Sequence, residues 1–191
     1  MSSKLGAGVT RTDRPLADGR TIRYYDTREQ VRAAADKREK AEQPGIGELR
    51  LDPLVNEWVA MASHRQGRVF LPPKELCPLC PSTSENLTEV PEEDFEVVVF
   101  DNKSPSLRPP VGDWALPDMA GPDTDTGSAA GKCEVICFTA DHGQSFKDLS
   151  TERIRVLLEA WMDRTRELSQ EKFIQHITPF ENRGEEVGVT L

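Results

Sequence analysis

Long apolar runs are absent from this 191-residue sequence, and basic residues are in deficit. No stretch approaches the length that a membrane-crossing helix needs, and the N-terminal MSSKLGAGVTRTDRP lacks the apolar core of a secretory signal. Lysine and arginine number 24 against 33 aspartates and glutamates, a formal net charge of −9. A nucleic-acid or anionic-membrane surface needs a basic field, so we expect neither partner. A local anion pocket made of a few arginines is still compatible with this charge.

Cysteine is also scarce, with four residues. A chain of this length can bury a core without crosslinks, so four cysteines indicate thiols or a metal site rather than a disulfide framework. That usage is typical of a reducing compartment, and we expect a cytoplasmic protein. Hydrophobic residues make up 37% and charged residues 30% of the sequence, which is typical of a soluble globular chain on the polar side.

Residues 1–45 are polar and dense in charge. The segment TREQVRAAADKREKAEQ favours helix by propensity but has no good apolar stripe, and Pro44 and Gly45 end it. We interpret this range as a surface helix or a mobile arm. Residues 46–191 are then expected to form the globular domain.

Alternating apolar residues predict several strands after Gly47. GELRLDPLVNEWVAMAS is typical of strand, turn and strand, with Asp52-Pro53 opening the turn. FEVVVFDN and CEVICFTA are typical of buried strands. Further strands are expected in ITPFENRG and in GVTL.

The clearest helix of the sequence follows Ser150, a good N-cap candidate. The face that we expect it to bury consists of Ile154, Leu157, Leu158, Trp161, Thr165 and Leu168. Strands in hairpins with one helix laid across them indicate an α+β fold.

The sequence CPLC carries the first chemical signal. Cys77 and Cys80 are spaced to hold one tetrahedral zinc, and His142, at the end of the CEVIC strand, is the best third ligand. Spacing alone leaves two alternatives open: free thiols beside a surface histidine, or a redox pair, although no βαβ unit surrounds this one. Cys133 and Cys137 are interpreted as ordinary buried thiols.

Arginines and amides supply the second signal. Arg65 and Arg68, in HRQGR just past a strand, can bind a pyrophosphate through their guanidinium groups. The alternative interpretation of the same residues is a solvated basic turn. Asn102 and Asn182 lie at strand-to-turn junctions, where an amide can read a base or a ribose hydroxyl, or only support a turn. His176 is expected to be an exposed linker residue.

Five stretches of the sequence occur together in one order: ELRLDPLVNEWVAMASHRQGRVFLPP, ELCPLCPST, VVVFDNKSPSL, CEVICFTADH and PFENRGEEVGVTL. In this order they resemble the galactose-1-phosphate uridylyltransferases, a family of the histidine-triad superfamily, from Leu16 to Leu191. The resemblance implies an α+β fold with a histidine-triad-like antiparallel half-barrel sheet, one long helix packed on it, and an incomplete C-terminal side.

The resemblance also implies roles for individual residues. Cys77, Cys80 and His142 would bind zinc. Arg65 and Arg68 would face the nucleotide phosphates. The residues that would line the uridine pocket or meet the nucleotide through their backbone are Leu79, Phe100, Asn102, Asn182, Val189 and Thr190.

The reaction of the family is covalent. A nucleophilic histidine attacks the α-phosphorus of UDP-glucose and expels glucose 1-phosphate, and a hexose 1-phosphate then takes the uridylyl group. That histidine belongs to a His-Pro-His-x-Gln motif which follows GVTL in the family, and its first histidine would be the fourth zinc ligand. The 191 residues do not contain this motif. The resemblance therefore implies the zinc- and nucleotide-binding half of a transferase of galactose metabolism, inactive by itself.

Two departures from the family pattern leave alternatives open. Ser104 stands where the family has a phenylalanine, which removes an apolar wall near the base. The missing motif is compatible with a second chain that carries the C-terminal half, with a homodimer, or with a truncated or degenerate product. The alternative functions are an inactive zinc-stabilised nucleotide-binding or interaction module, and an adenylyltransferase of the same superfamily.

Overall fold

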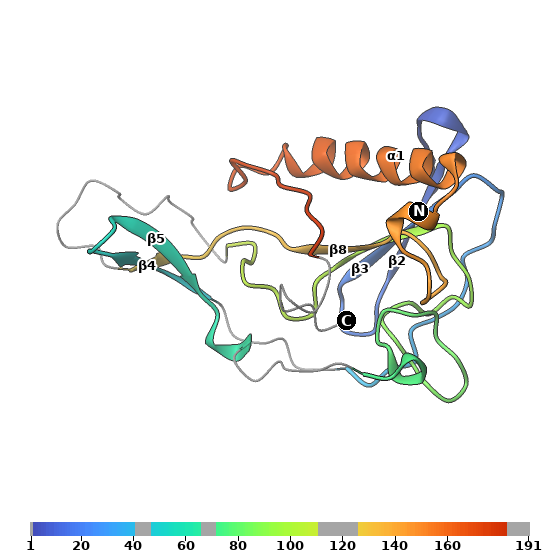
Figure 1. The fold of residues 1–191 in the computed structure, drawn as a ribbon, viewed down its shortest axis with the longest axis horizontal. Coiled ribbons are helices and arrows are strands. Elements are labelled where there is room, and N and C mark those ends of the chain that lie inside the picture. Colours follow the sequence, from blue (N-terminus) through green and yellow to red (C-terminus); the bar gives the residue numbers. More distant parts are fainter. Residues whose placement is uncertain (1, 41–46, 66–71, 111–125, 183–191) are drawn as a thin grey trace.

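The computed structural model describes residues 2–40, 47–65, 72–110 and 126–182. Antiparallel strands form two sheets, and the helix α1 (Thr151–Leu168) lies along one face of the larger sheet (Figure 1). Single turns of 3-10 helix occur at Gly6–Gly8, Ser63–Arg65, Lys74–Leu76 and Phe146–Asp148. The α+β class that the sequence predicts is confirmed, and the sheets of the described residues do not close into a barrel.

The main sheet has five strands in the order β1-β2-β3-β6-β8, all antiparallel to their neighbours. They are β1 (Ser2–Lys4), β2 (Thr10–Pro15), β3 (Thr21–Asp26), β6 (Val97–Asp101) and β8 (Glu134–Cys137). In the register of the sheet, Val98 lies opposite Cys137. The strands predicted in FEVVVFDN and CEVICFTA are thus confirmed.

The first three strands come from the range 1–45, so its interpretation as a surface helix or a mobile arm is wrong for the described residues. Strands β2 and β3 form a hairpin, and β3 pairs directly with β6. Residues 27–40 contain no helix. Strand β2 lacks the apolar alternation that would predict a strand, because ion pairs hold its side chains. One example is the pair of Arg11 with Asp163 of α1 at 2.9 Å.

Both faces of the main sheet are buried, because a core cluster packs against each of them. Alternate side chains of a strand point to opposite sides, so one strand contributes residues to both clusters. The core between the sheet and α1 contains Val9, Tyr25, Val97, Val99, Val156, Leu157 and Ala160. The core on the other face contains Leu16, Ile22, Tyr24, Val90, Phe95, Val98 and Phe100. Leu79 and Cys137 pack against this second core, so the CPLC segment lies on the face opposite α1.

Helix α1 begins where the sequence predicts. The Ser150 hydroxyl accepts a hydrogen bond from the Arg153 backbone N–H at 3.2 Å, which caps the first turn. A capping box at Ser145 and Asp148 precedes it.

The buried side of α1 differs from the predicted face. Leu157 and Leu168 are buried, but Leu158 is 45% exposed, and Asp163 and Arg164 are buried in its place. Arg164 forms a two-pronged ion pair with Glu134 of β8 at 2.8 and 2.9 Å. Such pairing allows charged side chains to occupy positions that periodicity assigns to solvent.

A smaller antiparallel sheet has the order β5-β4-β7. Its strands are β4 (Glu48–Asp52), β5 (Glu57–Met61) and β7 (Thr126–Ser128), and the β4–β5 hairpin confirms the predicted strand–turn–strand unit. Asn56 closes the turn with a φ of 54°, a conformation that asparagine tolerates well. Figure 1 shows this hairpin projecting away from the main sheet.

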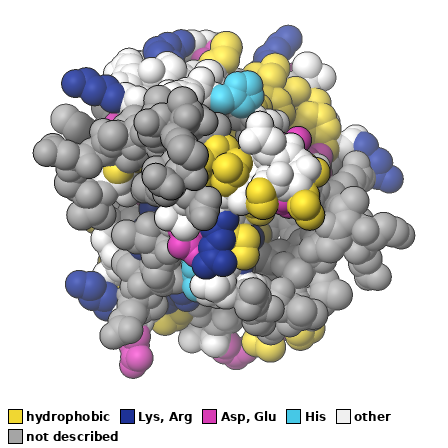
Figure 2. Space-filling model, turned by 90° about the vertical axis from the view of Figure 1, so that its left-hand side faces the viewer, with side chains coloured by type: hydrophobic (Ala, Val, Ile, Leu, Met, Phe, Trp, Pro, Cys, Tyr) yellow, Lys and Arg dark blue, Asp and Glu magenta, His cyan; other side chains and the backbone are white. Residues whose placement is uncertain are grey.

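The strand predicted in ITPFENRG is wrong for the residues described, because 177–182 form no regular element. The strand predicted in GVTL lies outside the described residues. Figure 2 views the molecule from the hairpin end, and basic side chains on its described part occur as separate spots rather than as a continuous field. Among the described residues, no helix is long and apolar enough to cross a membrane.

Candidate functional site

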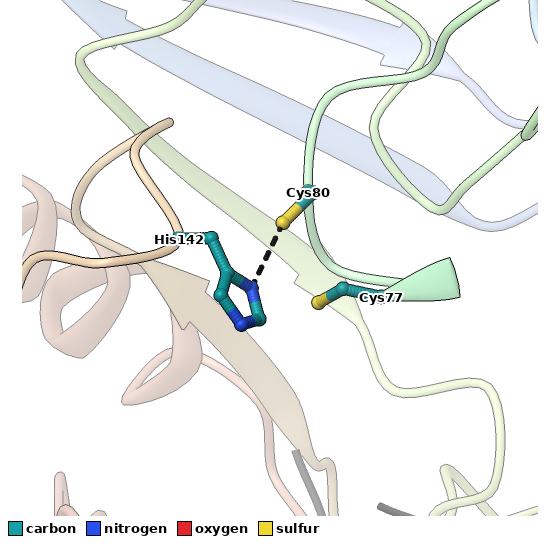
Figure 3. A group of neighbouring side chains, drawn as sticks. All are labelled: Cys77, Cys80 and His142. Atoms are coloured by element: carbon teal, nitrogen blue, oxygen red, sulfur yellow. Dashed lines mark hydrogen bonds between the residues drawn. The ribbon is translucent and has the colours of Figure 1, made fainter. Parts of the chain in front are cut away.

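Cys77, Cys80 and His142 converge on one point. The ligand atoms of the three side chains all lie within 4.8 Å of one another. Figure 3 shows the side chains pointing toward each other, from the turn after Lys74–Leu76 and from the loop after β8, and the Cys80 Sγ is 3.3 Å from His142 Nδ1. Residues 62 positions apart are thus brought together by the fold, which distinguishes a built cluster from scattered thiols.

The turn that carries the two cysteines is fixed by the segment that follows it. The Glu89 backbone N–H donates to the Pro78 carbonyl at 2.9 Å, and the Thr88 hydroxyl donates to the Cys80 carbonyl at 2.5 Å. Thr88 and Glu89 are both buried. Residues 88–90 therefore act as a backing for the CPLC turn, residues 77–80.

A separate turn presents His142. The Asp141 carboxylate accepts a hydrogen bond from the Gly143 N–H at 2.9 Å, and the Asp141 N–H donates to the Thr139 hydroxyl at 3.1 Å. These local bonds hold the loop in a tight form directly after β8. The imidazole is therefore carried on a short support anchored in the main sheet.

The donor set fits zinc, which prefers thiolate and imidazole ligands in a tetrahedron. Burial raises the pKa of Cys80 to about 11, with the hydrogen bond and charge of Cys77 adding to the effect. Because that thiol holds its proton at neutral pH, a metal must displace the proton to bind the thiolate. The described residues supply three donors, so a fourth position would go to water or to a ligand from elsewhere.

Cys133 and Cys137 were expected to be ordinary buried thiols, and the side chains of both are partly buried. Cys137 packs against the second core, and burial raises its pKa to about 12, with the charges of Cys77 and Cys80 contributing. Cys133 Sγ lies 3.7 Å from the Ser106 hydroxyl.

Leu79 and Phe100, two candidates for the uridine pocket, lie on the same face of the main sheet. Leu79 is partly buried and packs against the core cluster that contains Phe100. Phe100 itself is only 1% exposed. It therefore supports this face from within and presents no open wall, and its contact with a nucleotide stays a prediction.

Asn102 and Arg65 meet at the far end of β6. The Asn102 Oδ1 accepts a hydrogen bond from the Ser104 backbone N–H at 2.9 Å, so its side chain supports the turn, which is one of the two roles expected. Arg65 Nη1 donates to the Ser104 carbonyl at 3.1 Å, and His64 Nε2 lies 3.1 Å from the Pro105 carbonyl. The guanidinium of one predicted motif thus contacts the loop that carries the amide of another, and both side chains bond to the Ser104 backbone.

Other sequence candidates are exposed or lie outside the described residues. Asn182 and His176 are exposed, the latter as expected. Arg68, Val189 and Thr190 lie outside the described residues.

The sequence reasoning missed the side chains behind the CPLC turn. Thr88 and Glu89 make their contacts with residues of that turn and, in the case of Glu89, with arginines far back in the chain. No local pattern identifies such residues, because polar side chains after a proline-rich segment are ordinarily solvent-exposed.

Comparison with known proteins gives the family of this chain. The model of the family described as "Galactose-1-phosphate uridyl transferase, N-terminal domain" matches residues 36–191. A galactose-1-phosphate uridylyltransferase of Streptomyces lividans is 42% identical over 96% of this chain and 46% of its own length. One from Thermotoga maritima is 41% identical over 75% of this chain and 43% of its own length.

A more distant relative is the galactose-1-phosphate uridylyltransferase of Rattus norvegicus, 31% identical over 73% of this chain and 39% of its own length. The chain spans less than half the length of these relatives. No solved structure is significantly similar to it. The family match covers the CPLC turn, the His142 loop and the Arg65–Asn102 loop, and the chain belongs to the galactose-1-phosphate uridyl transferase family, whose N-terminal domain it matches.

Proposed function

We propose that this chain is the zinc- and nucleotide-binding half of a UDP-glucose:hexose-1-phosphate uridylyltransferase. The observation that carries the proposal is the convergence of Cys77, Cys80 and His142, with ligand atoms within 4.8 Å, in a chain of this family. The main sheet with α1 on one face would correspond to the antiparallel half-barrel and helix of the histidine-triad superfamily. The proposal includes a cytoplasmic location and a place in galactose metabolism.

Zinc would be held by the two thiolates and the imidazole. When bound, it would supply a structural crosslink between the CPLC turn and the loop after β8. That crosslink would fix Leu79, which lies between the two cysteines and would pack near the uracil. The metal is given no part in the chemical steps.

The nucleotide would lie along the face opposite α1. Arg65 and Arg68 would neutralise the phosphates, because guanidinium groups match phosphate oxygens in charge and geometry. The Asn102 Oδ1 is engaged by Ser104, so its NH₂ group would be the one that donates to the uridine. The remaining contacts would come from Phe100, Asn182, Val189 and Thr190.

The covalent step would use a histidine from outside the 191 residues. Its imidazole nitrogen would form a bond to the α-phosphorus as the bond to the bridging oxygen breaks, and glucose 1-phosphate would leave with the electron pair. A hexose 1-phosphate oxygen would then attack the same phosphorus and release the histidine. This chain's arginines would stabilise the charge on the phosphoryl oxygens.

Nucleotide preference tests the proposal. Calorimetric titration of the zinc-loaded chain should give tighter binding for UDP and UDP-glucose than for ADP and ADP-glucose, by about tenfold or 1.4 kcal/mol. Equal or tighter binding of the adenine nucleotides would replace this function with that of an adenylyltransferase. Absence of binding to all four would leave a zinc-stabilised interaction module.

Matched variants locate the phosphate contact. Arg65→Gln should weaken UDP binding about tenfold and leave uridine binding unchanged, because the lost interaction is with phosphate. Arg28→Gln is the control, since the Arg28 side chain is 67% exposed and pairs with Glu96 at 3.5 Å, away from the loop of Arg65. If Arg65→Gln affects uridine and UDP equally, Arg65 is not the phosphate ligand.

A further inference from the structure

Arg20 lies buried between the CPLC turn and the loop that begins at Asn102, which is called the Asn102 loop. Its guanidinium donates to the Glu89 carboxylate at 2.5 Å and to the Asp101 backbone carbonyl at 2.7 Å. A third bond, to Asp18 at 2.7 Å, orients the side chain from its own turn. Arg20 is 6% exposed, so this fork is held inside the protein.

One prong of the fork reaches the metal side of the site. Glu89 accepts the Arg20 hydrogen bond with its side chain, and its backbone N–H holds the Pro78 carbonyl of the CPLC turn at 2.9 Å. The neighbouring Thr88 holds the Cys80 carbonyl. A displacement of Glu89 would therefore move both attachment points of the turn that carries the thiols.

The other prong reaches the nucleotide side. Asp101 is the last residue of β6, and Asn102 follows it directly. The Asn102 side chain shapes the turn through Ser104, whose carbonyl accepts the Arg65 bond. The position of the Asp101 carbonyl thus bears on the loop where the amide and the guanidinium meet.

A second arginine completes the arrangement. Arg38 donates to the other oxygen of Glu89, and it forms a two-pronged pair with Asp36 at 2.7 and 2.9 Å. Asp36 in turn accepts a hydrogen bond from the Ala17 N–H at 2.9 Å. Glu89 is therefore gripped on both oxygens, which leaves its carboxylate a single position.

Arg20 precedes residue 36, where the family match begins. The segment that carries it would count as an appendage by that criterion, yet it supplies β1, β2 and β3. A buried ion pair is weak evidence for stability by itself, because desolvation offsets much of the attraction. The contacts of Arg20 with Glu89 and with the Asp101 carbonyl indicate a role in geometry instead.

We propose that Arg20 is a positioning residue that sets the CPLC turn and the Asn102 loop in fixed relation to each other. The proposal rests on the proposed function, because the two loops are the metal and nucleotide parts of that site. Arg20 touches neither ligand. It acts through Glu89 on the metal turn and through Asp101 on the Asn102 loop.

Arg20→Lys tests this role in the full chain, with Arg32→Lys as the matched control. Lysine keeps the charge but lacks the rigid fork that bonds to two partners at once. Arg32 is buried as deeply as Arg20 and also spans a carboxylate, Asp26, and a backbone carbonyl, that of Asp94. It contacts neither loop of the site. Both variants should therefore lose thermal stability to a similar degree.

The deciding measurement is cobalt affinity, determined by competition with a chromogenic chelator and by the absorption of the bound ion. Arg20→Lys should weaken cobalt binding about tenfold, the lower range for loss of an outer support of a metal site. Arg32→Lys should leave it within about twofold, below the range of such a support. If Arg20→Lys lowers the melting temperature of the metal-free chain but leaves cobalt affinity unchanged, the proposed role of Arg20 is wrong.

A second variant keeps the test decisive if Arg20→Lys does not fold. Glu89→Gln preserves the shape of the side chain and removes the charge that both arginines grip, so cobalt affinity should fall as in Arg20→Lys. Equal cobalt loss in the Arg32 control would show general destabilisation and overturn the proposal. A wild-type chain that binds no cobalt would remove the metal site, and with it both this inference and the proposed function.

Discussion

Tyr25 of strand β3 donates a hydrogen bond to Asp163 of helix α1, with 2.8 Å between the phenolic oxygen and Oδ2. Both residues are buried. Burial raises the pKa of Tyr25 well above its ordinary value, and the hydrogen bond to Asp163 and its charge add to this. The same Asp163 oxygen accepts a bond from Arg11 at 2.9 Å, so polar contacts tie the helix to the sheet through the apolar core.

Tyr25→Phe should lower the free energy of unfolding by about 1–3 kcal/mol, because a buried hydrogen bond to a charged group is lost. Chemical denaturation checks this. Combining the change with Asp163→Ala, which removes the acceptor, in a double-mutant cycle should show coupling between the two positions. Strictly additive losses would mean that the bond contributes nothing to the docking of α1.

Acid should weaken this junction through Glu167. Burial raises the pKa of Glu167, but hydrogen bonds from Arg11 and Arg164 outweigh it and bring the pKa down to about 2. A carboxylate whose pKa is lower in the folded state stabilises the fold above its unfolded pKa of 4.5, and that contribution is lost as the pH falls from there toward 2.

The stability difference between wild type and Glu167→Gln should therefore be present at pH 7 and shrink below about pH 4.5. Urea denaturation at a series of pH values measures it. A difference that stays constant from pH 7 to pH 3 would show that the ion pairs of Glu167 do not stabilise the native state.

Local signals sufficed for much of the fold. Ser150 and the apolar residues behind it predict α1, and the alternation around Trp58 predicts the β4–β5 hairpin, because caps and strand periodicity act between near neighbours. The CPLC spacing and the strand-end position of His142 likewise predicted the cluster that the structure shows. The helix and the hairpin need no knowledge of distant contacts, whereas the cluster joins residues 62 positions apart.

The rest depended on contacts across the chain. Strand β2 is polar because Arg11 pairs with Asp163, 152 residues away, and no periodicity reveals such a pair. A second ion pair, between Arg164 and Glu134, accompanies the burial of Arg164, while Leu158 is half-exposed, so the buried face of the helix differs in part from the expected one. Glu89 was missed for this reason too, since its partners are Arg20 and Arg38.

Removal of a ligand should identify the metal site. Cys80→Ser should weaken zinc binding by more than about 100-fold, the upper range for loss of a mere outer support of a metal site. Cys133→Ser, whose sulfur lies by Ser106 and not by His142, should leave zinc affinity unchanged. Chelator competition measures both, and tight zinc binding by the Cys80 variant would refute the ligand assignment.

The substitution Ser104→Phe should strengthen uridine binding. Partial burial of a phenylalanine ring against the base contributes about 1 kcal/mol, or roughly fivefold in affinity. Lys103→Phe at the exposed neighbouring position is the control. If both substitutions raise UDP affinity equally, the gain comes from nonspecific hydrophobic contact and not from an apolar wall near the base.

Uridylyl transfer in trans tests the central claim most directly. The chain would be mixed with the part of the Streptomyces lividans relative that lies beyond the 46% matched here. Transfer from UDP-glucose to galactose 1-phosphate should appear and should fall in Arg65→Gln and Cys80→Ser. The relative's own two parts, mixed in the same way, provide the positive control. Activity in that control without any in the mixture with this chain would contradict its assignment as the zinc- and nucleotide-binding half of a uridylyltransferase.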